Sequence, residues 1–333
     1  MAGLLKRLIP RGLARRSAER AAQQRRAELE RQQQWALFNI KTLGYELARA
    51  LTNKPSPPPP EQPVACGLRS KLCTQADIES RWFSFWCAEA GVAPVYIRKV
   101  WEFCFIAQAL FEAGMLAPDR AGIAFGCGRE PLPSLLAKYG CDILATDLRS
   151  TDPRAGRWGG ADALEPRLAE LRRADLCPDP ERLAAVEFRW VDMTDIPRDL
   201  DGRFDFCWSS CAMEHLGGLA AGAEFVANSL RVLKPNGVAV HTTEFNLDDG
   251  DTLDTTGLAL FQRRHIEALI ERLRSAGQAA ADPDFDAGDG LLDRFVDLPP
   301  WHSDLYPDPE FHLKVALAGY RCTSFGLIVR RGG

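Results

Sequence analysis

The stretch AGIAFGCGREPLPSLLAKYGCDILATD, residues 121–147, decides the fold. It opens with an apolar run, residues 121–125, that predicts a buried strand. A tight turn, Gly126-Cys-Gly128, leads into a helix predicted from Pro131 to Tyr139, and a second apolar run, residues 141–146, predicts the next strand. Strands that alternate with helices in this way are typical of βαβ units in a parallel, doubly wound α/β sheet.

The turn and the residue after the second strand indicate an adenosine-containing cofactor. A glycine-rich strand-to-helix turn lets a ligand approach the backbone and meet the unpaired N–H groups of the helix. Asp147 lies 19 residues after Gly128, where doubly wound folds place a carboxylate that accepts both hydroxyls of a ribose. A dinucleotide turn would have glycine where this chain has Pro131, whose ring keeps helix and strand apart around a pyrophosphate. NAD is therefore disfavoured.

Three further motifs follow in order. Val191-Asp192-Met193 comes after an apolar run, residues 204–216 read as a strand that closes on Glu-His-Leu, and Leu-Lys-Pro-Asn-Gly at 233–237 leads into another strand. On these residues the sequence resembles the S-adenosylmethionine-dependent class I methyltransferases. The stretch from His312 to Val329 looks like the hairpin that completes the family's sheet. The resemblance implies a doubly wound, mostly parallel seven-stranded methyltransferase sheet, here with an N-terminal helical extension.

The resemblance also implies how S-adenosylmethionine is held. The glycine turn, Gly126, Cys127 and Gly128, would line the methionine part, and Asp147 with Leu148, after the second strand, would bind the ribose. The acidic turn, Asp192 with Met193, would bracket the adenine. Ser209, at the end of the fourth strand, would lie beneath the sulfonium.

The glycine turn departs from the family's pattern at two positions. The acidic residue that usually precedes the first glycine by two places is Ala124 here, and Glu130 stands where a third small residue is usual. Two interpretations of Glu130 stay open. It supplies the carboxylate near the methionyl ammonium, or it only favours the positive N-terminus of the next helix.

Methyl transfer from a sulfonium is an in-line displacement, which requires an aligned and deprotonated acceptor. His215 follows the fourth strand, where the family's acceptor pocket opens, and imidazole titrates near neutral pH. A structural place in a helix's first turn is the alternative for His215. His241 and Glu244 are competing candidates, because strand ends in this architecture face the ligand crevice. Asp205 is expected to order the start of its strand.

Composition divides the chain into four parts. Strong helix formers dominate residues 14–51, and six prolines fall within 53–63. We predict a basic helical arm over 1–52, a Pro-rich linker over 53–63, a helical, aromatic-rich segment on the substrate side over 64–118, and an S-adenosylmethionine-binding α/β domain over 119–333. On the arm, one face would carry Ile40, Leu43, Leu47 and Leu51. In the aromatic segment, Arg98, Lys99 and Trp101 either line the acceptor side or are solvated charges and a core side chain.

Charge separates the arm from the rest. Residues 1–60 carry 12 Lys/Arg and 4 Asp/Glu, and residues 61–333 carry 29 and 41. An acidic main domain argues against nucleic acid as a partner, because duplex binding depends on Lys and Arg at phosphates. No apolar run is long enough to span a bilayer and no signal peptide is recognisable, so we expect a cytoplasmic protein. The basic arm keeps contact with a membrane surface or another protein open.

Ten cysteines are unusually many, yet none forms a Cys-x-x-Cys pair and no histidine lies at zinc-ligand spacing. Most lie in apolar runs, where a thiol behaves as a small hydrophobic group. We therefore expect buried reduced thiols and no metal.

The resemblance implies an S-adenosylmethionine-dependent methyltransferase that transfers a methyl group in line to a hydroxyl or amine. A likeness to methyltransferases of bacterial surface-glycan pathways makes a sugar or glycan the preferred acceptor. Ala124 and Glu130 motivate an alternative, a catalytically inactive methyltransferase fold that serves as a binding subunit. A third reading, an NAD-dependent oxidoreductase, is opposed by Pro131. Neither the acceptor nor the oligomeric state follows from the sequence.

Overall fold

The structure is a computed structural model that describes residues 11–51, 57–149, 151–152, 154, 164–301 and 310–333. Within these ranges the side chains of 11–15, 17, 18 and 164–166 are not described. The chain divides into two compact units, Met1–Leu51 and Thr52–Gly333.

Helix α1 (Arg11–Leu51) forms the described part of the first unit and confirms the helix predicted there. It consists largely of Ala, Arg, Gln, Glu and Leu, which favour helix. The four side chains expected on one face, those of Ile40, Leu43, Leu47 and Leu51, are 54–70% exposed. Across the described residues, no helix combines the length and the apolar character that crossing a membrane requires.

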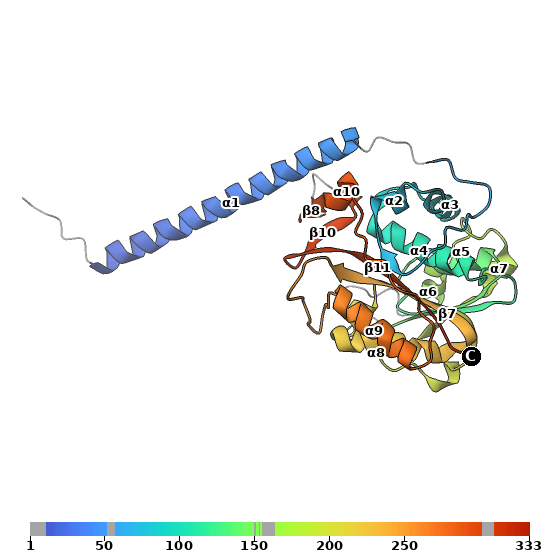
Figure 1. Cartoon of the computed structure of the whole chain (residues 1–333). Helices are drawn as coiled ribbons and strands as arrows, with labels where there is room; N and C mark the ends of the chain where they lie inside the picture. The colour runs from blue at the N-terminus through green and yellow to red at the C-terminus, as the bar shows by residue number, and fades with distance from the viewer. Residues whose placement is uncertain (1–10, 52–56, 150, 153, 155–163, 302–309) are drawn as a thin grey trace, which may run out of the picture. The chain divides into compact units, whose positions relative to one another are not determined.

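The second unit is built on one central sheet (Figure 1). Its main strands are β3 (Ala121–Ala124), β4 (Asp142–Asp147), β5 (Val186–Trp190), β6 (Phe204–Ser210), β7 (Leu233–Asn246), β10 (Lys314–Leu317) and β11 (Tyr320–Arg330). They lie in the order β5-β4-β3-β6-β7-β11-β10. The first five are parallel, and β11 runs antiparallel to both of its neighbours, β7 and β10. The predicted doubly wound, mostly parallel sheet and its C-terminal hairpin are confirmed.

The sheet has two strands more than the predicted seven. Strand β1 (Lys71–Leu72) pairs antiparallel with β11, and β8 (Val296–Asp297) pairs parallel with β10. A separate pair, β2 (Tyr96–Ile97) and β9 (Phe311–His312), joins the aromatic segment to the C-terminal region. Each of these strands has two residues, too few for an alternation of apolar and polar residues to reveal them.

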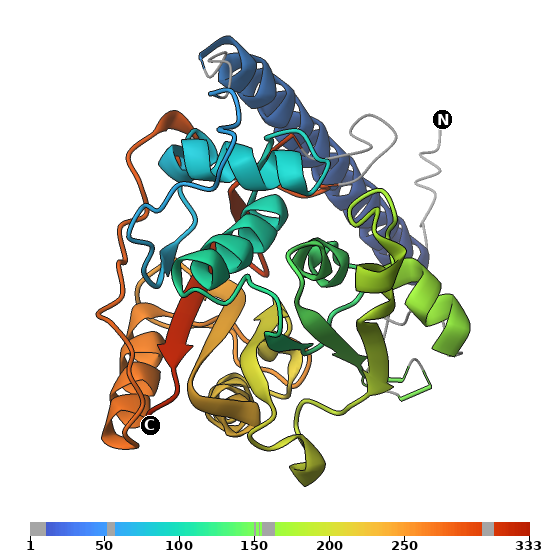
Figure 2. The same cartoon turned by 90° about the vertical axis from the view of Figure 1, so that its right-hand side faces the viewer.

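Helices cover both faces of the sheet, as Figures 1 and 2 show. Helices α4, α5 and α7 lie on one face, and α8 and α9 lie on the other. Every residue of the central strand β6 is consequently buried. The helices of this unit are α2 (Gln75–Ile78), α3 (Arg81–Glu89), α4 (Arg98–Glu112), α5 (Leu132–Lys138), α6 (Leu164–Leu171), α7 (Pro180–Ala184), α8 (Leu219–Ser229), α9 (Arg263–Ser275) and α10 (Leu291–Arg294), with 3-10 turns η2 (Arg198–Leu200), η3 (Met213–His215) and η4 (Leu230–Val232).

The aromatic stripe of residues 64–118 packs as core. Trp86, Trp101 and Phe105 are fully buried, and the rings of Trp101 and Phe105 stack with centroids 4.8 Å apart. Helix α4 approaches β11 closely because Gly326 faces Phe105, where a Cβ would lie 2.3 Å from the ring. The structure thus places Trp101 in the core, the second of the two roles left open for it.

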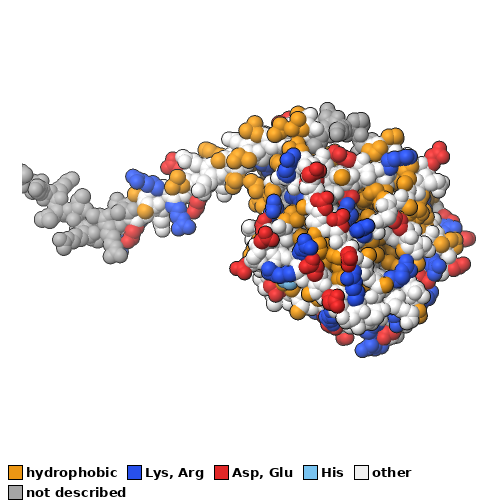
Figure 3. Space-filling view, in the orientation of Figure 1, with side chains coloured by type: hydrophobic (Ala, Val, Ile, Leu, Met, Phe, Trp, Pro, Cys, Tyr) orange, Lys and Arg blue, Asp and Glu red, His pale blue; other side chains and the backbone are white. Residues whose placement is uncertain are grey.

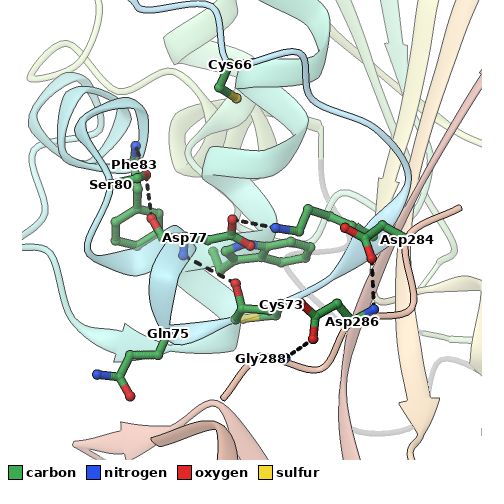
Figure 4. A network of polar contacts seen from close by, with 12 residues as sticks. Cys66, Cys73, Gln75, Asp77, Ser80, Phe83, Asp284, Asp286 and Gly288 are labelled. Atoms are coloured by element: carbon green, nitrogen blue, oxygen red, sulfur yellow. Dashed lines mark hydrogen bonds and ion pairs between the residues drawn. The ribbon is translucent and has the colours of Figure 1, made fainter. Parts of the chain in front are cut away.

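A buried carboxylate fastens this aromatic segment to the sheet (Figure 4). Asp77 accepts hydrogen bonds from Lys71 Nζ at 2.7 Å and from the indole N–H of Trp101 at 3.0 Å. The backbone of Lys71 also forms an isolated parallel β-bridge with Asp284, which belongs to a loop beside Asp77. These contacts hold α4 in place against the sheet.

All ten cysteines are free, and eight are buried, which confirms the expectation of reduced, mostly buried thiols. Cys66 is exposed and Cys211 is partly buried.

Acidic and basic side chains are interspersed over the face of the second unit seen in Figure 3.

Candidate functional site

The glycine turn follows β3 at the carboxyl edge of the sheet. Gly126 and Gly128 have φ of +60° and +52°, in the left-handed region that favours glycine. The N–H of Cys127 donates to Thr146 O at 3.0 Å, which ties the turn to β4. A Cβ on Gly128 would meet no atom within 4 Å, so the described structure is open at the position where a ligand is expected.

Asp147 ends β4 and faces this turn. Its Oδ2 accepts the N–H of Gly128 at 3.2 Å, and its Oδ1 accepts the N–H of Leu148 at 2.8 Å. Burial raises the pKa of the Asp147 carboxyl, and the guanidinium of Arg167 opposes that rise. Arg167 comes from α6, is fully buried and forms an ion pair with Oδ2. A carboxylate accepts about four hydrogen bonds, so with three donors present about one position remains, on Oδ1, for a ribose hydroxyl.

Sequence reasoning missed Arg167. The residue lies 20 positions after Asp147, beyond a stretch without a recognisable pattern, and nothing local distinguishes it from the other arginines of that region.

Three of the expected ribose and adenine residues, Asp147, Leu148 and Asp192, line one pocket of about 320 Å³. Asp147 and Leu148 lie on one side of it, and Val191 and Asp192 on the other, at the ends of the paired strands β4 and β5. Asp192 forms an ion pair with Arg154 at 2.7 Å and accepts the N–H of Thr194 at 2.8 Å. Met193 is buried, with its sulfur 3.1 Å from the position of a Cβ on Gly126. The two carboxylates and the space between them suit a ligand that carries hydroxyl groups.

Glu130 is buried at the start of α5 and is held by one indole. Trp208 Nε1 in β6 donates to Glu130 Oε1 at 2.5 Å. Burial raises the pKa of the Glu130 carboxyl to about 8, although the Trp208 hydrogen bond and the charge of Lys99 act in the opposite direction. A ligand ammonium at this place would supply the positive charge that the buried carboxylate requires.

His241 and Ser209 face the α8 side of the sheet. The imidazole is fully buried, with Nδ1 2.8 Å from Ser209 Oγ and Nε2 3.0 Å from Ser229 Oγ. Burial lowers the pKa of His241 to about 3. A neutral, enclosed imidazole with both nitrogens in hydrogen bonds is placed to join β6, β7 and α8.

Glu244 lies on the opposite face of β7, toward α4. Its Oε1 accepts from Arg98 Nη1, and the side chain is 7% exposed. Lys99 also points to this side, donating to Glu102 at 2.9 Å and to Ser210 Oγ at 3.1 Å. Arg98 and the half-exposed Lys99 therefore belong to a charge cluster between α4 and the sheet. Glu102, its fully buried centre, was missed because it reads as an ordinary helix residue.

His215 ends the turn η3, apart from His241. Its Nδ1 is 2.8 Å from the carbonyl oxygen of Gly257. A carbonyl only accepts, so Nδ1 is the donor in this hydrogen bond.

Asp205 has the ordering role that was expected. It accepts from Arg120 at 2.9 Å, from the N–H of Ala121 at 2.9 Å and from Lys234 at 2.7 Å, and so ties the starts of β3, β6 and β7 together.

Comparison with known proteins supports the fold assignment. Residues 123–241 match the family model of a methyltransferase domain, which confirms the resemblance over this stretch. No curated protein sequence matches the chain.

Three solved structures illustrate the distant likeness. A candidate sarcosine dimethylglycine methyltransferase from Galdieria sulphuraria is 17% identical over 70% of this chain and 84% of its own, with a TM-score of 0.40. The 1,6-didemethyltoxoflavin-N1-methyltransferase from Burkholderia thailandensis is 17% identical over 68% and 76%, with a TM-score of 0.38. The CcbJ methyltransferase from Streptomyces caelestis is 13% identical over 73% and 92%, with a TM-score of 0.39. Likenesses this distant say nothing of the methyl acceptor.

Proposed function

We propose, on the premise that residues 123–241 are a class I methyltransferase domain, that this chain is an S-adenosylmethionine-dependent methyltransferase acting on a hydroxyl or amine. One observation carries the proposal. Asp147 and Asp192, the carboxylates expected at the ribose and the adenine, line the same pocket at the ends of adjacent strands. The open space beside Gly128 and the buried Glu130 support a place for the methionine end.

The bound cofactor would supply the electrophilic methyl group. The chain's residues would bind and orient it: Asp147 and Leu148 at the ribose, Asp192 and Met193 at the adenine, and the backbone of residues 126–128 with Glu130 at the methionine part. Holding the reacting atoms in line supplies much of the acceleration of a displacement reaction.

His215 is our candidate for the residue that accepts the acceptor's proton. It follows β6, where the resemblance puts the acceptor pocket, and its Nδ1 donates to Gly257 O at 2.8 Å, which orients the ring. His241 is the weaker candidate because its imidazole is enclosed in the core. Glu244 lies in the charge cluster on the acceptor side and carries a separate inference below.

Sugar or glycan hydroxyls are the acceptors we would screen first, following the resemblance to methyltransferases of surface-glycan pathways. Free cysteines agree with a cytoplasmic location, where thiols stay reduced. The basic arm, residues 1–52, would provide contact with an anionic membrane surface or another protein.

Titration calorimetry of the full chain tests the proposal. We expect saturable one-to-one binding of S-adenosylmethionine and of S-adenosylhomocysteine, no binding of NAD, and release of S-adenosylhomocysteine in the presence of an acceptor pool. Binding without turnover over broad acceptor pools would favour the inactive binding subunit. Binding of NAD alone would overturn the proposal.

A further inference from the structure

Three side chains with metal-binding atoms converge next to the acceptor side. Cys211 follows β6, Glu214 lies in η3 and Glu244 lies near the end of β7. The thiol sulfur and one oxygen of each carboxylate all lie within 4.8 Å of one another. We refer to these three residues as the Cys211 triad.

Two oxygens of the triad are buried without a donor. Glu214 Oε2 accepts from Thr243 Oγ1 at 3.2 Å, and Glu244 Oε1 accepts from Arg98. The other oxygen of each carboxylate, Glu214 Oε1 and Glu244 Oε2, has no hydrogen-bond partner among the described residues. Glu214 is fully buried and Glu244 is 7% exposed. Buried carboxylate oxygens are costly unless a donor or a cation satisfies them.

The charges around the triad leave room for a further cation. Three carboxylates, those of Glu102, Glu214 and Glu244, face two cations, Arg98 and Lys99. A dication bound to a Cys211 thiolate would bring this group of charges to electrical neutrality.

The backbone holds Cys211 in an uncommon conformation. Its φ is +48°, in the left-handed region that costs a non-glycine residue free energy and occurs often at functional sites. The N–H of Cys211 donates to Thr242 O and to Thr242 Oγ1, both at 3.1 Å. These bonds fix the residue, and its thiol donates to Glu102 at 2.9 Å.

We propose that Cys211, Glu214 and Glu244 form a binding site for a single divalent cation of the zinc type. One sulfur and two carboxylate oxygens suit a borderline-soft ion, since Mg²⁺ and Ca²⁺ prefer oxygen ligands alone. Zinc bonds of about 2.0–2.3 Å place tetrahedral ligands roughly 3.3–3.8 Å apart, so small side-chain rotations close the triad. Binding replaces the S–H bond by an S–metal bond and releases one proton to solvent.

Zinc itself is the probe for the test. The full chain is stripped with a chelator, dialysed, and titrated with Zn²⁺ against a chromogenic chelator, and the bound metal is counted by mass spectrometry. We expect one zinc per chain. Substitution with Co²⁺ is expected to produce a thiolate-to-cobalt charge-transfer band, which carboxylates alone cannot produce.

Matched variants identify the ligands. Cys211→Ser and Glu214→Gln should each weaken zinc binding by at least about 100-fold, because even outer-shell partners change metal affinity by about 10–100-fold. Cys66→Ser is the control, since Cys66 is an exposed thiol that also contacts a carboxylate, Glu112. It should bind zinc like the parent.

Two results would overturn the inference. One is a stripped, folded chain that does not bind zinc with one-to-one stoichiometry. The other is a charge-transfer band that survives Cys211→Ser or is lost in Cys66→Ser. Circular dichroism and the melting transition establish that each variant is folded. The first result is measured on the parent protein and does not depend on any variant.

Discussion

The guanidinium of Arg167 forms an ion pair with the carboxylate of Asp147, at the oxygen that also accepts the N–H of Gly128. The pair joins α6 to the turn between β3 and α5. Arg167 is fully buried, so Asp147 has a structural partner in addition to its proposed ligand.

Asp147→Asn is expected to weaken S-adenosylmethionine binding by about 1.5–3 kcal/mol, the range for hydrogen bonds to a charged group. Asparagine keeps the volume and still offers Arg167 an oxygen. Titration calorimetry gives the affinity, and Asp142→Asn, at the exposed start of the same strand, is the control with unchanged affinity. Equal affinities for parent and Asp147→Asn, with intact melting transitions, would remove Asp147 from the site.

Gly128→Ala should fold but lose the cofactor. The new Cβ meets no atom within 4 Å, so the cost to stability is the backbone strain at φ +52°, about 1–2 kcal/mol. The methyl group would occupy space that a bound methionine part needs. Gly67→Ala matches it, with φ of +68° and equally open surroundings, and should lower stability without changing affinity. If Gly128→Ala binds like Gly67→Ala, the turn does not touch the ligand.

Glu130→Gln should change how stability depends on pH. Burial raises the pKa of Glu130 from 4.5 to about 8, so between these values the folded chain keeps a proton that the unfolded chain has released. The parent therefore loses stability, relative to Glu130→Gln, as pH rises from about 4.5 to about 8, by an amount on the order of a few kcal/mol. Denaturant unfolding at pH 5, 6.5 and 8.5 measures the difference. Parallel changes in both proteins would contradict the prediction.

His241 should remain neutral through the physiological range. Burial lowers its pKa from 6.5 to about 3, so the unfolded chain takes up a proton first as pH falls. The parent then loses stability below about pH 6.5 relative to His241→Gln, and the loss grows down to about pH 3. Resonances of the labelled imidazole give a direct check. A His241 signal that titrates between pH 5 and 8 in the folded chain would refute this placement.

Removal of residues 1–51 should leave a folded unit that binds the cofactor. Thr52–Gly333 is a compact unit of its own, and on α1 the side chains of Ile40 and Leu43 are exposed, whereas those of Tyr45 and Ala48 are buried. The deletion removes the basic segment, so any binding to vesicles with anionic lipid should fall and should already be salt-sensitive in the full chain. Co-sedimentation at low and high salt measures it. Vesicle binding that is unaltered by the deletion would mean that the arm is a solvated helix.

Local pattern in the sequence determined much of the fold and of the cofactor side. Apolar runs and a turn with two glycines were enough to predict the order of elements, and the family resemblance singled out Asp147 and Asp192, which line one pocket. The reason is that parallel strands end at one edge, so residues just after them converge whatever the details of packing. The extra strands β1 and β8 escaped because two residues carry no periodicity.

Tertiary structure alone decided which side chains meet beyond that edge. Arg167 reaches Asp147 from a separate helix, and Cys211, Glu214 and Glu244 come together from three elements. His241 and Glu244 lie three residues apart on β7, so strand alternation places them on opposite faces, but it does not say which face is lined by α8 and which by α4. Which helix covers which face depends on the path of the chain between the strands. The sequence of β7 itself does not determine that path.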